Sequence, residues 1–155
     1  MLVDPVLCAA LFLFATAVNL ASVLAVGPSL VLMGEEMSVS LRDVLFSVEE
    51  RAQASIWSTN FGGPVYFWMA AHLDPHFSLF SARRWKAVAM ALLAPLVYLV
   101  LRRRLRCSRA PALLGGVTVV LMPGVAMFGW LATENGLESV LGAAGLYLAT
   151  SRRRA

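Results

Sequence analysis

The sequence predicts an all-α, polytopic membrane protein with about four transmembrane helices. Of its 155 residues, 59% are hydrophobic and only 14% are charged, whereas soluble domains contain about 45–50% apolar and about 25% charged residues. The apolar residues gather in long runs, and the arginines lie in short blocks beside those runs. These observations exclude an ordinary soluble or disordered chain. Cys8 and Cys107, the only cysteines, are too few for a disulfide-stapled secreted domain.

The first apolar run covers residues 6–33 and is predicted to form the first span. A helix needs about 20 apolar residues to cross the hydrocarbon core of a bilayer, and this run is longer than that. Met1 to Pro5 contain no Lys or Arg, so the run lacks the basic leader of a cleaved signal peptide. We therefore expect an uncleaved span.

Residues 34–82 are predicted to form an outer loop with its own short helices. Apolar residues between Val39 and Val48 recur at roughly helical spacing, which predicts an amphipathic helix on the membrane surface or on the bundle. The aromatic segment Val65–Leu73 is too short to cross a bilayer and suits the interface.

Three further spans are predicted at residues 83–101, 110–132 and 137–151. Pro95 is expected to kink the second span or to leave a carbonyl group open, and the last two spans are expected to form a helical hairpin. Because four spans bury little surface against one another, faces rich in small residues should remain exposed for further helices of this chain or of a partner chain. These faces lie around Gly115, Gly116, Gly124 and Gly142.

The arginine blocks predict the orientation of the chain in the membrane. Arg102–Arg104 follow the second span and Arg152–Arg154 follow the fourth. The positive-inside rule places such blocks in the cytoplasm. We therefore expect a plasma-membrane protein with both termini cytoplasmic and residues 34–82 outside. The basic residues flank apolar runs, so they indicate topology and not nucleic-acid binding.

Three acidic residues are candidates for chemistry on the outer face. Glu35 and Glu36 follow the first span directly, and Glu134 lies in the turn between the last two spans. Each could be a solvated residue at a helix end. Alternatively, a carboxylate at the membrane surface could act as a general base that takes a proton from an acceptor hydroxyl. No metal site is predicted, since the chain lacks cysteine–histidine spacing of the metal-binding kind.

Arg83 and Arg84, with Lys86 nearby, are basic residues on the predicted outer side and so break the charge rule locally. Their side chains could extend to the phosphates of membrane lipids. Alternatively, they could bind a substrate phosphate, because arginine presents a fixed fork of donors to phosphate oxygens.

The order of these features resembles the membrane-embedded C-type glycosyltransferases that use polyprenyl-phosphate sugars, in particular the protein mannosyltransferases and the lipid A aminoarabinose transferases. In that family an acidic pair ends the first span, as in Gly34-Glu35-Glu36, and a Pro-aromatic element opens an outer segment, as in Gly62–Phe67. An arginine then begins the second span, as Arg83 or Arg84 does, and a Pro-containing span leads to a polar turn, as in Pro123–Glu134.

The resemblance implies transfer of a sugar from a polyprenyl-phosphate donor to an acceptor, with inversion at the sugar carbon. It implies that Glu35 or Glu36 is the base, that Glu134 is a second acidic site residue, and that Arg83 or Arg84 holds the donor phosphate. No cofactor is implied with certainty, and a divalent cation is left open. Family members carry many more spans, so we expect this chain to be an N-terminal module of a larger domain that is inactive in isolation.

Two alternative functions compete with sugar transfer. The chain could be a small non-catalytic polytopic protein, such as an accessory subunit. In that case the candidate residues should share no cavity, and a long apolar face should remain for a partner. A transporter would need polar residues near the middle of several spans, where Asn19 is nearly alone. The glycosyltransferase hypothesis predicts instead that the three carboxylates and the arginines converge on one outward cavity.

Overall fold

The computed structural model describes residues 3–27, 79–129 and 137–150, and every regular element within these ranges is a helix. This confirms the all-α prediction for the part of the chain that the structure describes. The elements in chain order are α1 (Val3–Val26), α5 (Leu79–Ala91), α6 (Leu93–Leu99), the π-helix η1 (Val100–Arg104), α7 (Arg109–Leu121), α8 (Pro123–Phe128) and α9 (Leu137–Ala149).

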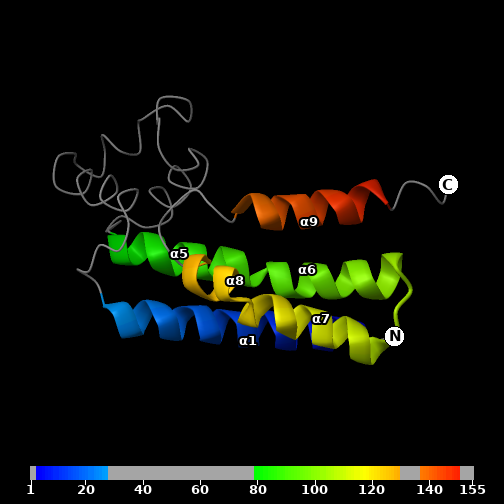
Figure 1. The fold of residues 1–155 in the computed structure, drawn as a ribbon, viewed down its shortest axis with the longest axis horizontal. Helices are drawn as coiled ribbons and strands as arrows, with labels where there is room; N and C mark the ends of the chain where they lie inside the picture. The colour runs from blue at the N-terminus through cyan, green and yellow to red at the C-terminus, as the bar shows by residue number, and fades with distance from the viewer. Residues whose placement is uncertain (1–2, 28–78, 130–136, 151–155) are drawn as a thin grey trace.

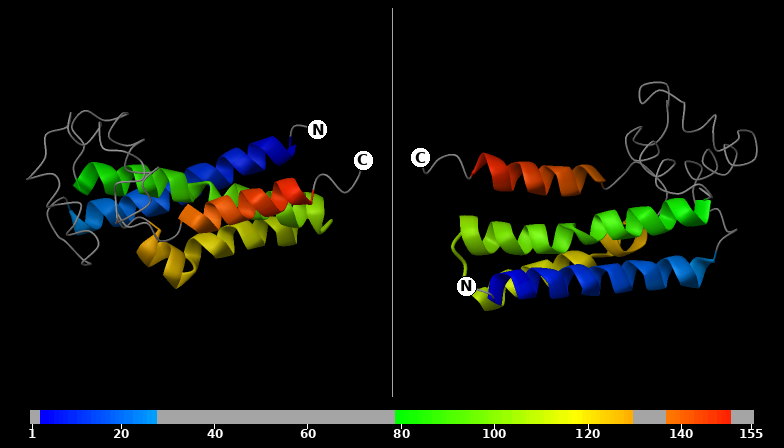
Figure 2. Two further views of the ribbon diagram at one scale, coloured as in Figure 1. Left: turned by 90° about the horizontal axis from the view of Figure 1, so that it is seen from above. Right: turned by 180° about the vertical axis from the view of Figure 1, so that it is seen from behind.

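The helices form an elongated bundle with α6 at its centre, in contact with α1, α7 and α9 (Figure 1). The continuous rod of α5, α6 and η1 runs opposite to α1 and lies between α1 and α9 (Figure 2). The bundle has two ends. The end with the start of α1, η1, the start of α7 and the last turn of α9 is called the Asp4 end. The end with the last turn of α1 and the start of α5 is called the Gly27 end, and α9 starts beside the middle of the central rod (Figure 1).

Helix α1 stops at Gly27, before the boundary at residue 33 that apolarity alone predicts. Gly27 has a φ of +81°, in the left-handed region that glycine adopts at no steric cost. Its N–H donates to the carbonyl oxygen of Val23 at 3.2 Å, which completes a typical glycine C-terminal cap. Pro28 follows and is a common residue just past a helix end.

The rod from Arg83 to Arg104 contains 22 residues and, with the 24 residues of α1, is long and apolar enough to cross a membrane. Its α-helical pattern breaks at Leu92, whose N–H donates to Ala89 three residues earlier. The break agrees with the predicted effect of Pro95, because a proline ring clashes with the carbonyl group four residues before it.

The predicted third span is broken, and the third and fourth helices are short. Met122 has a ψ of 130°, which separates α7 from α8. The residue before a proline is driven out of the helical region, and Pro123 then starts α8 at a position where its missing N–H is not needed. Helices α7 and α9 have 13 residues each, or about 20 Å of rise. Four complete spans therefore stay a prediction.

The bundle buries polar groups and exposes large apolar ones. Asn19, Ser81, Arg83 and Lys86 are buried, whereas Leu13 and Leu141 are 66% and 72% exposed. Soluble proteins rarely expose wide apolar surfaces of this kind. Together with the two long apolar helices, this distribution indicates association with a membrane.

The small residues predicted to be exposed divide into two groups. Gly116 is buried against Leu11 and Ala94, and the side chain of Leu101 lies over Gly115. Gly124 and Gly142 have open space around them. The prediction of exposed small-residue faces is therefore wrong for α7, because α7 uses its glycines to approach α6 closely.

Candidate functional site

The structure describes only part of the predicted site. Glu35, Glu36 and Glu134 lie outside the described residues, as do the predicted surface helix and the aromatic segment. Arg83 and Arg84 are described, and both are on α5 near the Gly27 end. The predicted convergence of carboxylates and arginines therefore stays a prediction. Of the predicted site, the structure describes the two arginines.

Arg83 is fully buried between α5 and α1. Its Nη1 donates a hydrogen bond to the carbonyl oxygen of Gly27 at 3.0 Å. The last carbonyl groups of a helix lack partners within the helix and carry partial negative charge. Arg83 therefore ties the last turn of α1 to the first turns of α5.

Lys86 is also fully buried, and it follows Arg83 by three residues on α5. Residues three apart share one face of a helix, so two cationic groups lie on the buried face of α5. Both side chains interact with other groups of the protein. Burying charge between helices costs free energy unless partners compensate it, so these contacts are needed to keep the two basic side chains buried.

Arg84 is placed differently, although it is adjacent in sequence. Its side chain is exposed, and its guanidinium carbon lies 5.9 Å from the centre of the Phe80 ring. Neighbouring helical positions point about 100° apart. The structure therefore separates the two arginines that the sequence could not distinguish.

Asn19 extends the polar contact between α1 and α5 toward the middle of the bundle. It is 2% exposed, and its Nδ2 donates to the carbonyl oxygen of Ala87 at 3.1 Å. The Oδ1 atom of Asn19 and the hydroxyl oxygen of Thr16, one helical turn earlier, are buried with no hydrogen-bond partner in the described part of the chain. The α1–α5 interface thus carries polar groups from its middle to the Gly27 end.

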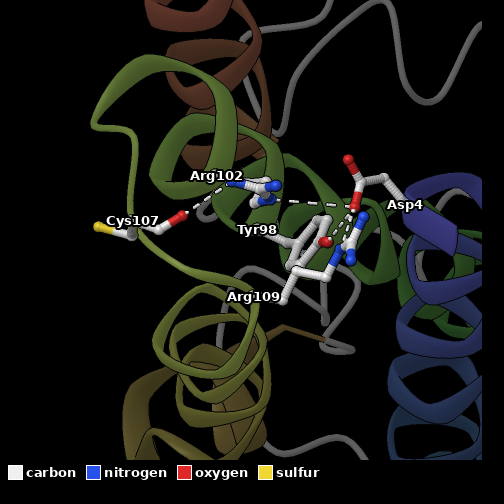
Figure 3. A network of polar contacts seen from close by, with 5 residues as sticks. All are labelled: Asp4, Tyr98, Arg102, Cys107 and Arg109. Carbon is white, nitrogen blue, oxygen red and sulfur yellow. Dashed lines mark hydrogen bonds and ion pairs between the residues drawn. The ribbon is translucent and has the colours of Figure 1, made fainter. Parts of the chain in front are cut away.

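The Asp4 end holds a polar network that the sequence did not predict (Figure 3). The Oδ1 atom of Asp4 accepts hydrogen bonds from the Tyr98 hydroxyl at 2.9 Å and from Nε of Arg109 at 3.2 Å. Arg102 lies beside them, with its Nε 3.9 Å from the same oxygen, and its Nη1 donates to the carbonyl oxygen of Cys107 at 3.1 Å. One carboxylate thereby joins α1, α6, η1 and α7.

The network connects residues far apart in sequence, so no local pattern reveals it. Two features of the sequence nonetheless pointed to a contact between the N-terminus and the basic residues. Asp4 is an acidic residue in the first turn of a helix, where the helix dipole favours negative charge. The basic block Arg102–Arg104 was predicted on the same side of the membrane as the N-terminus, and Arg109 follows it closely in the sequence. The contact between Asp4 and Arg109 brings these two segments together.

The described side chains can bind anions but do not by themselves make an acid–base centre. Within the described ranges, no group of three His, Cys, Asp or Glu side chains is placed to hold a metal ion. The arginines at both ends of the bundle can pair with phosphate oxygens. Comparison of the chain with protein-family models, with curated proteins and with solved structures finds no match.

Proposed function

We propose that the chain is the N-terminal module of an integral membrane glycosyltransferase, which transfers a sugar from a polyprenyl-phosphate donor to an acceptor on the outer face of the plasma membrane. The proposal includes four spans with both termini in the cytoplasm, so that the Gly27 end faces outward. The observation that carries it is the buried cationic pair of Arg83 and Lys86 at the Gly27 end.

The pair suits the phosphate of a lipid-linked donor. A buried guanidinium is held in a fixed direction, and in surroundings of low polarity its attraction for an anion is stronger than in water. The leaving group of the proposed reaction is a polyprenyl phosphate, on which negative charge develops as the bond to the sugar breaks. Arg83 would stabilise that charge, with Lys86 adding to the positive field.

Chain connectivity supports the remaining assignments. Glu35 lies eight positions after Gly27, a link of at most about 28 Å. Glu134 lies three positions before the start of α9, a link of at most about 11 Å, and α9 starts beside the middle of the central rod (Figure 1). Glu35 and Glu36 are thus tethered to the end that holds Arg83, and Glu134 is tethered to the start of α9.

In the proposed reaction, the acceptor hydroxyl oxygen attacks the anomeric carbon of the sugar. The new carbon–oxygen bond forms as the bond to the donor phosphate breaks, with inversion at carbon. Glu35 or Glu36 takes the hydroxyl proton as general base, and the electron pair of the broken bond leaves on the phosphate beside Arg83.

Binding of a polyprenyl phosphate to the purified chain in detergent tests the cationic site. Arg83→Gln should weaken binding by about tenfold or more, because a charge-assisted hydrogen bond contributes about 1.5–3 kcal/mol. Arg84→Gln is the matched control, since it removes the same charge from the adjacent, exposed position. Arg83→Lys keeps the charge and should bind with intermediate affinity if the fork of donors matters. Equal affinity in the wild type and in a folded Arg83→Gln variant would exclude Arg83 from the site.

Sugar transfer is tested with a labelled polyprenyl-phosphate sugar, in membranes from cells that express the full-length protein of which this chain is proposed to be the N-terminal module. Glu35→Gln or Glu36→Gln should abolish transfer, whichever residue is the base. Wild-type transfer in both single variants and in the double variant would remove these residues from the mechanism.

A second candidate function, a non-catalytic accessory subunit, is favoured by the outer surface of α9. Leu148 is 62% exposed, and a methyl group added at Gly142 or Gly145 would meet no atom within 4 Å. Such a face can pack closely against another transmembrane helix. Failure of the chain to bind polyprenyl phosphate, with a stable complex to another membrane protein, would favour this function.

A further inference from the structure

The Asp4 end carries a cluster of arginines that exceeds what its one carboxylate can neutralise. Within the described residues, five arginines lie there beside Asp4, the only described acidic side chain at that end. They are Arg102, Arg103, Arg104, Arg106 and Arg109, and we call them the basic cluster. Asp4 pairs with Arg102 and Arg109, which leaves most of the positive charge of the cluster uncompensated.

Two members of the cluster are held in place by Tyr147 on α9. The guanidinium carbon of Arg104 lies 4.2 Å from the centre of the Tyr147 ring, and Nη1 of Arg103 is 3.5 Å from its hydroxyl oxygen. Stacking on an aromatic ring fixes the plane of a guanidinium and leaves its N–H edge open to an anion. The arginines are therefore positioned, and are not merely solvated.

Two donors of the cluster also make no hydrogen bond within the described residues. They are the buried Nε atoms of Arg102 and Arg104. Buried donors in proteins are nearly always paired with protein groups, water or a ligand. Nε of Arg102 lies 3.9 Å from Asp4 Oδ1, whereas Nε of Arg104 keeps hydrogen-bonding capacity that an oxygen atom of an anion could use.

The turn that follows η1 adds an exposed cation and an apolar surface. Arg106 is exposed and has a φ of 57°, in the left-handed region that residues with a side chain seldom adopt. Leu105 beside it is 65% exposed, and Leu146 on α9 is 53% exposed. An apolar surface thus adjoins the basic cluster, as the acyl chains of a lipid adjoin its headgroup.

We propose that the basic cluster binds the phosphate headgroup of an anionic phospholipid, with the acyl chains along Leu105 and α9. The cluster lies at the end of an apolar bundle, which is the level of the headgroups if α1 and the central rod cross the membrane. Basic pockets between transmembrane helices bind anionic lipids in this way. The site is at the opposite end of the bundle from the proposed donor site, so neither proposal depends on the other.

The test uses the purified chain in dodecyl maltoside, with phosphatidylglycerol or phosphatidylcholine added in mixed micelles and bound lipid counted by native mass spectrometry. Phosphatidylglycerol should be retained in preference to phosphatidylcholine. Arg104→Gln should weaken its retention by about tenfold. Arg84→Gln is the matched control, because it also removes one arginine that lies over an aromatic ring, at the other end of the bundle, and it should leave retention within about twofold of wild type.

A second variant keeps the test decisive if Arg104→Gln does not fold. Arg106→Gln changes an exposed side chain, so the fold should persist while phosphatidylglycerol retention falls. Equal retention of the two lipids, or equal losses in Arg84→Gln and in the cluster variants, would overturn the proposal. Complete displacement of phosphatidylglycerol by inorganic phosphate would identify a site for a free anion and would overturn the assignment to a lipid.

Discussion

The close approach of α7 to α6 predicts opposite effects for two glycine-to-alanine substitutions. A side-chain carbon added at Gly116 would lie 2.9 Å from Cδ1 of Leu11 and 3.1 Å from the carbonyl oxygen of Ala94. Leu11 could rotate only against the packed core in which it is buried. The Ala94 oxygen belongs to the backbone of α6, so that contact can be relieved only if α7 moves away.

The magnitude follows from two opposing contributions. Inserting a methyl group into a packed interface costs about 1–3 kcal/mol, while replacing glycine by alanine within a helix gains about 1 kcal/mol. Gly116→Ala should therefore lower the free energy of unfolding by up to about 2 kcal/mol. Gly142 lies in open space on α9, so Gly142→Ala has no packing cost. The higher helix propensity of alanine should then raise the free energy of unfolding by up to about 1 kcal/mol.

Reversible unfolding measures both variants. The chain in dodecyl maltoside is titrated with sodium dodecyl sulfate, and helix content is followed by circular dichroism. A Gly116→Ala variant at least as stable as Gly142→Ala would refute the close packing of α7 on α6. Gly116→Val provides a further check, because a branched side chain should destabilise the protein more than alanine does.

Three further substitutions test other parts of the fold. Asn19→Ala should lower the free energy of unfolding by about 0.6–1.7 kcal/mol in the same titration, because it removes the buried hydrogen bond to Ala87; an unchanged value would mean that this bond adds nothing. Asp4→Asn should lower the melting temperature and should do so less at high salt, where the wild type also loses part of its ion pairing. Pro123→Ala should join α7 and α8 into one helix, since it restores an N–H and frees Met122 from its extended conformation. Spin-label distances between α7 and α8 would lengthen, and unchanged distances would show that packing alone causes the break.

The parts of the fold that the sequence predicted are those governed by local rules. Length and apolarity predicted the two long helices, and proline chemistry predicted the interruption near Pro95. The first helix was predicted too long because apolarity outweighed the stop signal of Gly27 and Pro28. Pro123 was likewise placed inside the predicted span 110–132, although a proline at the first position of a helix is as readily the start of a new one.

The parts that could not be predicted depend on which face of a helix is buried. The polar residues of α5 do not gather on one face of the helix that would mark its orientation, so Arg83 and Arg84 were equivalent in the sequence. The network around Asp4 joins residues that are 94 and 105 positions apart, and only the packing of α1 against the central rod brings them together. Glu35, Glu36 and Glu134 lie outside the described residues, so their assignment remains a prediction.

The two ends of the bundle use positive charge in different ways, and the difference bears on function. At the Asp4 end, most members of the basic cluster are exposed or lie at the bundle's edge, as expected of residues that set membrane orientation or meet lipid headgroups. Orientation depends only on the number of positive charges near a span, so it gives no reason to bury Arg83 and Lys86. Apolar residues of similar volume are often as stabilising as buried charges or more so. Arg83 ties the last turn of α1 to α5, and the buried pair also brings to the Gly27 end the positive charge that the proposed binding of a phosphate would use.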